Sequence, residues 1–312
     1  MCGSRKVCKF VEDMTRIEQI GLAEGVVAPA SLRQGDLVWI VSPASAVDPM
    51  LVEGAANALQ RTGLRVRIAP HAACRRGTYS GTAEERIADF RAALADEGVR
   101  ALLCSRGGYG AVHLLGNVEP RPVWLIGFSD MSALHALWQS RGIASIHGSM
   151  AKHLAQFPAD DAANAAMMQI LTTGQMAPMQ WEWHPLNRAG TATGKIAGGN
   201  LAVLAQLIDT PVNLLLKDSI LVIEDIAEPI YKVERIMHQL RLSGVLKSLR
   251  GLIVGQFTDY RPDSNHESME QMIAELTAGY DYPVAMNAPI GHIDGNMPWI
   301  EGAQVTLHVK EQ

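Results

Sequence analysis

Short apolar runs alternate with stretches of helical spacing from Asp36 to about residue 155, and no other feature constrains the fold as strongly. Leu37–Val41 is a continuous apolar run, which is typical of a strand buried on both faces. Residues 49–63 then have helical spacing that stops at a glycine, and residues 64–69 alternate as a strand would. Further strands are predicted over 99–104 and 123–126, and further helices over 82–94 and 131–140. This order predicts an α/β domain with an open, mostly parallel sheet over residues 31–155.

The second half of the chain follows a different pattern. Prolines, glycines and two tryptophans (Trp181 and Trp183) punctuate residues 156–194, so we expect an interdomain linker there. Residues 195–312 are expected to form a smaller α+β domain, with strands over 220–223, 252–254 and 304–309 and helices from 200 and over 231–240. Met1–Ala23 scatter charges among apolar residues, which indicates a short leading helix or arm over residues 1–30.

Composition excludes several function classes. The 312 residues suffice for two domains of roughly 100–200 residues each. Lys and Arg total 27 against 32 Asp and Glu and form no basic stripe, which argues against nucleic acid as a partner. No apolar run approaches the ~20 residues that span a bilayer, and Met1–Ala23 lacks the apolar core of a signal peptide, so we expect a cytoplasmic protein without a membrane partner. The four cysteines contain no C-x-x-C pair, which predicts reduced thiols and no metal site (Cys2, Cys8, Cys74 and Cys104).

A candidate nucleophile lies where a predicted strand runs into a tight turn. Residues 122–130 end in Gly127-Phe128-Ser129-Asp130, and a predicted helix follows at once. A serine at such an elbow is held above the sheet, and the helix start places backbone N–H groups beside it. The amide of Asp130 could then help to stabilise an oxyanion. The alternative is that Ser129 or Asp130 only caps the helix.

A serine nucleophile needs a base and a carboxylate, and two candidates for each stay open on the residues alone. His147 lies at a predicted strand end, and His292 lies in a glycine- and proline-rich loop. Glu224 and Asp225 both close a predicted strand, where catalytic groups of α/β sheets gather. The glycine turn over residues 105–110 permits close backbone approach to an oxyanion or a phosphate, although it lacks the G-x-G-x-x-G spacing.

Five segments, taken in chain order, resemble the LD-carboxypeptidases, a family of serine peptidases. They are Ser105–Gly110, Gly127–Asp130, Gly198–Leu201, Leu221–Asp225 and Gly291–His292, and the resemblance spans roughly residues 36–310. The family fold that this implies is an N-terminal open α/β domain and a C-terminal domain with a small barrel-like sheet. Because the candidate serine lies in one half and the candidate glutamate and histidine in the other, the site would form across the cleft between them.

The resemblance also implies roles for individual residues. Ser129 would be the nucleophile, His292 the base and Glu224 the carboxylate that orients it. The oxyanion donors would be the backbone amides of Asp130 and Gly108.

Arg106, Gly107 and Tyr109 of the glycine turn are the candidate substrate-binding residues. A free substrate carboxylate needs a cation near the cleft, and Arg106 is the candidate for it. One departure from the family pattern is visible: Asn296 is kept, but residues 297–302 move the proline and place an acid before the glycine. This departure affects the expected pocket wall more than the triad.

The implied activity is release of a terminal D-Ala from murein tetrapeptide in cell-wall recycling, through an acyl-enzyme and without a metal or cofactor. The implied assembly is a homodimer. One alternative is the microcin-immunity type, which cleaves a peptidyl-nucleotide antibiotic and would stack the base on Trp181 or Trp183. Another is a non-catalytic module that binds a small ligand, in which Ser129 is only a helix cap.

Overall fold

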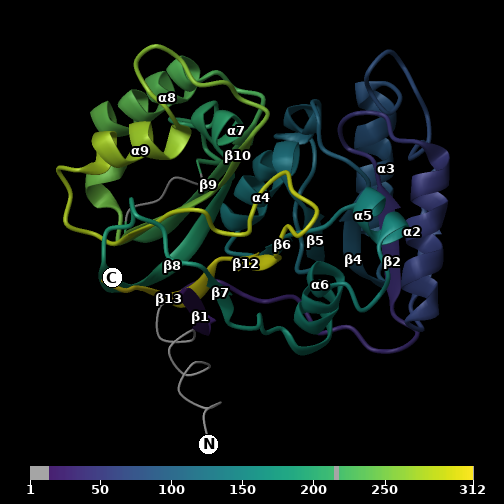
Figure 1. Cartoon of the computed structure of the whole chain (residues 1–312). Helices are drawn as coiled ribbons and strands as arrows, with labels where there is room; N and C mark the ends of the chain where they lie inside the picture. The colour runs from purple at the N-terminus through teal and green to yellow at the C-terminus, as the bar shows by residue number, and fades with distance from the viewer. Residues whose placement is uncertain (1–13, 214–217, 312) are drawn as a thin grey trace, which may run out of the picture.

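The computed structural model describes residues 14–213 and 218–311, so the first part of the expected arm, with Cys2 and Cys8, lies outside the described residues. Two sheets with helices packed on them make up the fold (Figure 1). Across the described ranges, no helix is long and apolar enough to span a bilayer. The chain is an α/β protein with two mixed sheets, of which the first is mostly parallel.

The first sheet has six strands in the order β12-β6-β5-β4-β2-β3. Every pair from β6 to β3 is parallel, and only β12 runs antiparallel, beside β6. The predicted strands at 37–41, 64–69, 99–104 and 123–126 are confirmed. The bounds are β2 Leu37–Val41, β3 Arg65–Ile68, β4 Val99–Cys104, β5 Trp124–Gly127, β6 Ser145–His147 and β12 Trp299–Glu301.

Helices cover both faces of this sheet. Three of them pack on one face: α2 Pro49–Arg61, α5 Ala151–Gln156 and α6 Ala162–Thr173. Two pack on the other: α3 Ala83–Ala95 and α4 Ser132–Gln139. The helix predicted over 82–94 is confirmed, and Thr82 and Glu85 form a reciprocal capping box at its start. The short 3-10 turns η1 Ala111–Leu114 and η2 Ser129–Met131 also lie in this half, whereas η3 Leu246–Ser248 lies in the second half of the chain.

The second sheet has seven strands in the order β11-β10-β9-β8-β13-β1-β7. Its parallel part runs from β8 to β11, and the remaining strands pair antiparallel. The bounds are β1 Thr15–Leu22, β7 Met179–Trp181, β8 Gly190–Asn200, β9 Ser219–Ile226, β10 Gly251–Thr258, β11 Val284–Ala285 and β13 Ala303–Val309. Three helices pack against one another beside it: α7 Leu201–Ala205, α8 Ile230–Leu242 and α9 Met269–Thr277.

The barrel-like closure expected for the second sheet is not seen. Its edge strands are β11 and β7, and within the described ranges no ladder joins them. The two edges nevertheless lie near each other. Arg188, which follows β7, forms an isolated bridge with Val284 of β11, and Trp181 of β7 donates from Nε1 to the Met286 carbonyl at 2.9 Å. The ladders among the described strands therefore show no barrel.

One expectation about the N-terminal segment is corrected. Residues 15–22 are not helical but form β1, whose buried Thr15 and Ile17 alternate with partly exposed neighbours. The segment 156–194, predicted as a linker, contains α6, β7 and the start of β8. β1 pairs with β13 and β7, contacts that local periodicity does not reveal.

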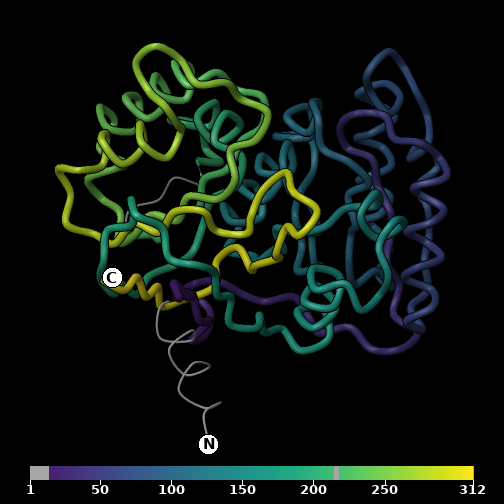
Figure 2. Tube along the Cα trace, viewed as in Figure 1, coloured from purple at the N-terminus to yellow at the C-terminus, as the bar shows by residue number. Residues whose placement is uncertain are grey.

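Both sheets use strands from distant parts of the chain. β1 lies near the start of the chain yet belongs to the second sheet, and β12 lies in the C-terminal half yet completes the first sheet. The segment between β11 and β12, yellow in Figure 2, consequently reaches from the second half toward the first. This crossing carries His292 to the end of β5.

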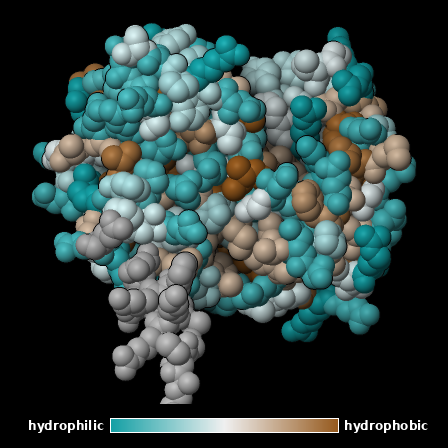
Figure 3. All heavy atoms as spheres, viewed as in Figure 1, coloured by the Kyte–Doolittle hydropathy of each residue, from teal (hydrophilic) through white to brown (hydrophobic). Residues whose placement is uncertain are grey.

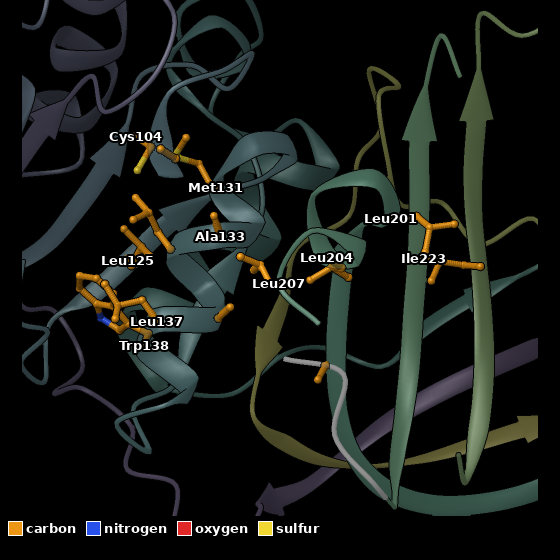
Figure 4. Packing of buried hydrophobic residues seen from close by; sticks show 14 of the residues in the cluster. Cys104, Leu125, Met131, Ala133, Leu137, Trp138, Leu201, Leu204, Leu207 and Ile223 are labelled. Carbon is orange, nitrogen blue, oxygen red and sulfur yellow. The ribbon is translucent and has the colours of Figure 1, made fainter. Parts of the chain in front are cut away.

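The core is shared between the halves. Two clusters of buried side chains each include residues from both sheets. In Figure 4, Leu207 lies beside α4 near Ala133, and Leu204 lies on α7 behind it. These residues and Leu137 of α4 belong to the same buried cluster. On the face drawn in Figure 3, hydrophilic residues predominate and apolar ones are scattered. Because these apolar side chains are buried between the two halves of the chain, their packing holds the two halves of the site together.

Candidate active site

Ser129 lies in a tight elbow between β5 and α4. Its backbone φ is 65°, a left-handed conformation that is uncommon for a residue with a side chain. Neither η2 nor α4 has a side-chain cap, so the capping hypothesis for Ser129 is wrong. The Asp130 carboxylate instead accepts a 2.8 Å bond from the amide of Ala111, which ties the elbow to the glycine turn. The Ser129 hydroxyl is left to contact His292.

His292 bridges the serine and a buried carboxylate. Its Nε2 lies 3.0 Å from Ser129 Oγ, and its Nδ1 lies 2.8 Å from Glu224 Oε2. Because an ionised carboxylate only accepts hydrogen bonds, we assign the proton of the neutral ring to Nδ1. Nε2 then offers its lone pair to the serine hydroxyl. Phe128 packs against the histidine ring with the centroids 5.0 Å apart.

The loop that carries His292 passes close over Glu224. Gly291 has φ 132°, and a Cβ there would lie 3.0 Å from the Gln256 carbonyl oxygen and 3.3 Å from the Glu224 Cβ. The amide of Gly291 donates to Asn296 Oδ1 at 2.9 Å. Only glycine meets both the backbone and the space requirement at this position.

Electrostatics distinguish the two acids at the end of β9. Glu224 has no exposed surface. Burial alone would lower the pKa of His292, but the hydrogen bond and charge of Glu224, with the charges of Asp225 and Asp259, outweigh burial and raise that pKa above 6.5. Asp225 accepts from Asn200 Nδ2 and from the amide of Ala202, both at 2.8 Å. Burial, reinforced by the charge of Glu224, raises the pKa of Asp225 to about 6.

The Gly198–Leu201 segment leads into α7, the helix predicted from residue 200. Asn200 caps α7 by accepting from the amide of Val203 at 3.1 Å. The backbone N–H of Asn200 donates to Ser132 Oγ at the start of α4, at 2.9 Å. The segment therefore joins α4 to the end of β9, on which Glu224 lies.

The glycine turn after β4 lies against the nucleophile. A Cβ on Gly107 would lie 2.8 Å from Ser129 Cβ, 2.9 Å from Ser129 Oγ and 3.3 Å from the Asp130 amide nitrogen. A Cβ on Gly108 would collide with Ser45 instead. The space beside Ser129 and the Asp130 amide is thus open only because residue 107 has no side chain.

Gly107→Ala is expected to lower kcat/KM about 100-fold or more, because the added methyl displaces the serine from its reactive position. Steady-state kinetics against the substrate proposed below measure this effect. Gly279→Ala is the matched control, since a Cβ at that position meets nothing within 4 Å. A folded Gly107→Ala variant with the wild-type kcat/KM would show that the space beside Ser129 is not needed for the reaction.

Two pockets meet at His292. The first, of about 780 Å³, is lined by Ser129 and by five residues predicted from the sequence to serve the site (Arg106, Gly107, Gly108, Tyr109 and Asp130). The second, of about 670 Å³, lacks the serine but shares Arg106 and His292 with the first. Tyr109 is 55% exposed at the rim. The serine, histidine and glutamate therefore lie in contact beside open space.

Other candidates lie outside this arrangement. His147 is fully buried and stacks on Trp299, and burial holds its pKa well below 6.5. Trp181 is buried and donates from Nε1 to the Met286 carbonyl at 2.9 Å, so it is not free to stack on a nucleobase. Trp183 lines neither pocket beside His292.

The sequence analysis assigned no functional role to two residues that line a pocket. Ser149 and Asn296 line the second pocket. Asn296 stood out only as part of a retained pattern. A signal existed for Ser149, because it follows the carboxyl end of the parallel strand β6, where functional groups of such sheets gather.

Two family models match the two halves of the chain. Residues 38–148 match the LD-carboxypeptidase N-terminal domain, and residues 193–307 match the LD-carboxypeptidase C-terminal domain. The chain is 31% identical over 288 residues to a murein tetrapeptide carboxypeptidase of Pseudomonas aeruginosa, covering 86% of this chain and 92% of that one. It is 28% identical over 299 residues to a probable murein peptide carboxypeptidase of Bacillus subtilis, covering 91% and 92%.

Solved structures have the same fold. A muramoyltetrapeptide carboxypeptidase from Oxalobacter formigenes superposes with a TM-score of 0.78 at 23% identity, covering 88% of this chain and 99% of that one. The microcin C7 self-immunity protein MccF superposes with a TM-score of 0.80 at 19% identity, covering 92% and 99%. Sequence and structural similarity both extend over most of the chain. The chain belongs to the LD-carboxypeptidase family.

Proposed function

We propose that this protein is a serine LD-carboxypeptidase that releases the terminal D-Ala of murein tetrapeptide. The observation that carries the proposal is the continuous contact from Ser129 Oγ through His292 to the buried Glu224. The Pseudomonas murein tetrapeptide carboxypeptidase and the Oxalobacter muramoyltetrapeptide carboxypeptidase, to which the chain is similar, support the choice of a murein peptide as substrate.

In the first step, His292 Nε2 takes the Ser129 proton while the oxygen attacks the carbonyl that precedes D-Ala. Glu224 holds the Nδ1 proton and stabilises the imidazolium that forms. His292 then gives its Nε2 proton to the leaving amine, and the C–N bond breaks to leave an acyl-serine. In the second half, His292 takes a proton from water while the water oxygen attacks the ester carbonyl. His292 then returns that proton to Ser129 Oγ as the ester C–O bond breaks, which frees the serine and releases the acyl part as a carboxylic acid.

The oxyanion formed in both halves would accept hydrogen bonds from the amides of Asp130 and Gly108. The Gly107 carbonyl accepts from the Ser45 amide at 3.2 Å. Because a trans peptide holds its N–H opposite its C=O, the Gly108 N–H points away from Ser45. Gly107 leaves room for the oxyanion next to the Asp130 amide.

The test combines a labelling and a turnover measurement. A serine-reactive phosphonate is expected to modify Ser129, identified by peptide mapping, and the purified protein is expected to release D-Ala from murein tetrapeptide. Failure to label any serine would favour the non-catalytic binding module. Labelling with hydrolysis of a peptidyl-adenylate, but not of the tetrapeptide, would favour the microcin-immunity type.

A further inference from the structure

The second pocket has polar groups buried in its wall for which the chain supplies no partner. Ser149 and Asn296 are each 2% exposed. Among residues 14–213 and 218–311, neither Ser149 Oγ nor Asn296 Nδ2 has a hydrogen-bond partner. Buried polar groups without partners are costly, so two of them in the wall of one pocket indicate a ligand that accepts hydrogen bonds.

The orientation of Asn296 is fixed by its other amide atom. Asn296 Oδ1 accepts from the amide of Gly291 at 2.9 Å, so the opposite end of the side-chain amide is the Nδ2 donor. The Ser149 hydroxyl can also donate. The pocket wall thus presents two donors, which suit a carboxylate better than an ammonium group.

The position of His292 assigns the pocket to the leaving group. Ser129, Gly107 and Asp130 line only the first pocket, so the acyl part of a substrate lies there. His292 lines both pockets. Because His292 must protonate the leaving amine, the residue that departs lies on its other side, in the second pocket.

The charges of this pocket also suit an anion. Arg106, Arg75 and Lys152 line it, together with His153, against the carboxylates of Asp48 and Asp294. Asp48 accepts from the amide of Met50 as the cap of α2, which already occupies one of its oxygens. Arg106 donates from one Nη to the Ala46 carbonyl at 2.9 Å, which holds the guanidinium at the boundary between the pockets.

We propose that the second pocket binds the free α-carboxylate of the departing D-residue, with Ser149 Oγ and Asn296 Nδ2 as donors and Arg106 as the counter-charge. This inference rests on the proposed LD-carboxypeptidase function. Because only the last residue of a peptide has a free α-carboxylate, binding of that group in the second pocket would restrict cleavage to the terminal peptide bond.

The experiment compares murein tetrapeptide with its C-terminal amide, as the ratio of the two kcat/KM values. The wild type is expected to prefer the free acid. Ser149→Ala is expected to lower kcat/KM for the acid about tenfold or more, as loss of one hydrogen bond to a charged group predicts, and to leave the amide nearly unaffected. At pH 8, Asn296→Asp keeps an oxygen for Gly291 but places a carboxylate against that of the substrate, so it is expected to shift the ratio further toward the amide.

Thr258→Val is the matched control, because Thr258 Oγ1 is also buried and unpartnered in the described part of the chain but lines neither pocket. It is expected to keep the wild-type ratio. If the wild type releases D-Ala but both pocket variants keep the wild-type acid-to-amide ratio, the inference is overturned and the proposed function stands. If the wild type neither releases D-Ala nor labels with the phosphonate, the proposed function itself fails.

Discussion

Ser129→Ala is expected to lower kcat for D-Ala release by about 10⁴-fold or more, because removal of the nucleophile of a triad leaves only binding and oxyanion stabilisation. His292 and Glu224 remain in contact in this variant, so substrate binding is expected to persist. Turnover by the purified variant and titration of the tetrapeptide by calorimetry measure the two effects separately. Wild-type turnover in the Ala variant would exclude Ser129 as nucleophile.

The same position allows a second, independent measurement. The φ of 65° at Ser129 is strained for any residue with a Cβ and unstrained for glycine. Ser129→Gly is therefore expected to be as inactive as Ser129→Ala but more stable than it by about 1 kcal/mol. Urea unfolding of the two variants gives the comparison. Equal stabilities would mean that the elbow does not hold residue 129 in a strained conformation.

The sequence predicted those parts of the fold that depend on local pattern. The apolar run Leu37–Val41 became the fully buried strand β2, and Thr82 became the cap of α3. The elbow at Ser129 was likewise visible as a strand running into a helix. In each case the residues that decide the structure lie next to one another in the chain.

What the sequence did not predict depends on pairing between distant residues. Residues 15–22 carry charges that obscure the alternation of β1, and their partner β13 lies almost 300 residues further along the chain. β12 has only three residues and pairs with β6 of the other half. The second pocket combines Ser149, which follows β6, with Asn296, which precedes β12. A site built by such crossing strands has no local signature.

The choice among the acids and histidines also depended on information beyond spacing. Glu224 and Asp225 are adjacent, and alternation along β9 sends them in opposite directions without saying which one meets a histidine. In the structure Glu224 contacts His292, whereas Asp225 holds Asn200 and the start of α7. The resemblance to LD-carboxypeptidases pointed to Glu224 and His292 because it compares whole arrangements of residues.

Glu224→Gln is expected to lower kcat by about 10³- to 10⁴-fold, because a glutamine amide can donate to Nδ1 and so favour the histidine tautomer that carries its proton on Nε2. That tautomer cannot accept the Ser129 proton.

The same variant also tests the pH dependence of the reaction. His292 must be neutral to act as a base, so the acid limb of kcat/KM follows its pKa, which lies above 6.5 in the wild type. Without the hydrogen bond and charge of Glu224 the pKa of His292 falls. The acid limb of the variant's residual kcat/KM is therefore expected at lower pH than that of the wild type.

The stability of the two proteins should diverge in the same pH range. A histidine whose pKa is raised by folding stabilises the native state below its unfolded pKa, and this contribution is lost as the pH rises through the folded pKa. Removing the Glu224 charge removes the contribution, so Glu224→Gln is expected to lose most stability, relative to the wild type, near pH 5.5 and less near pH 8.5. At the higher pH the wild type must also bury the Glu224 carboxylate beside a neutral histidine, which narrows the difference further. Urea unfolding at both pH values measures this trend, and a difference that grew with pH would show that the Glu224–His292 contact is not the ionic pair that raises the histidine pKa.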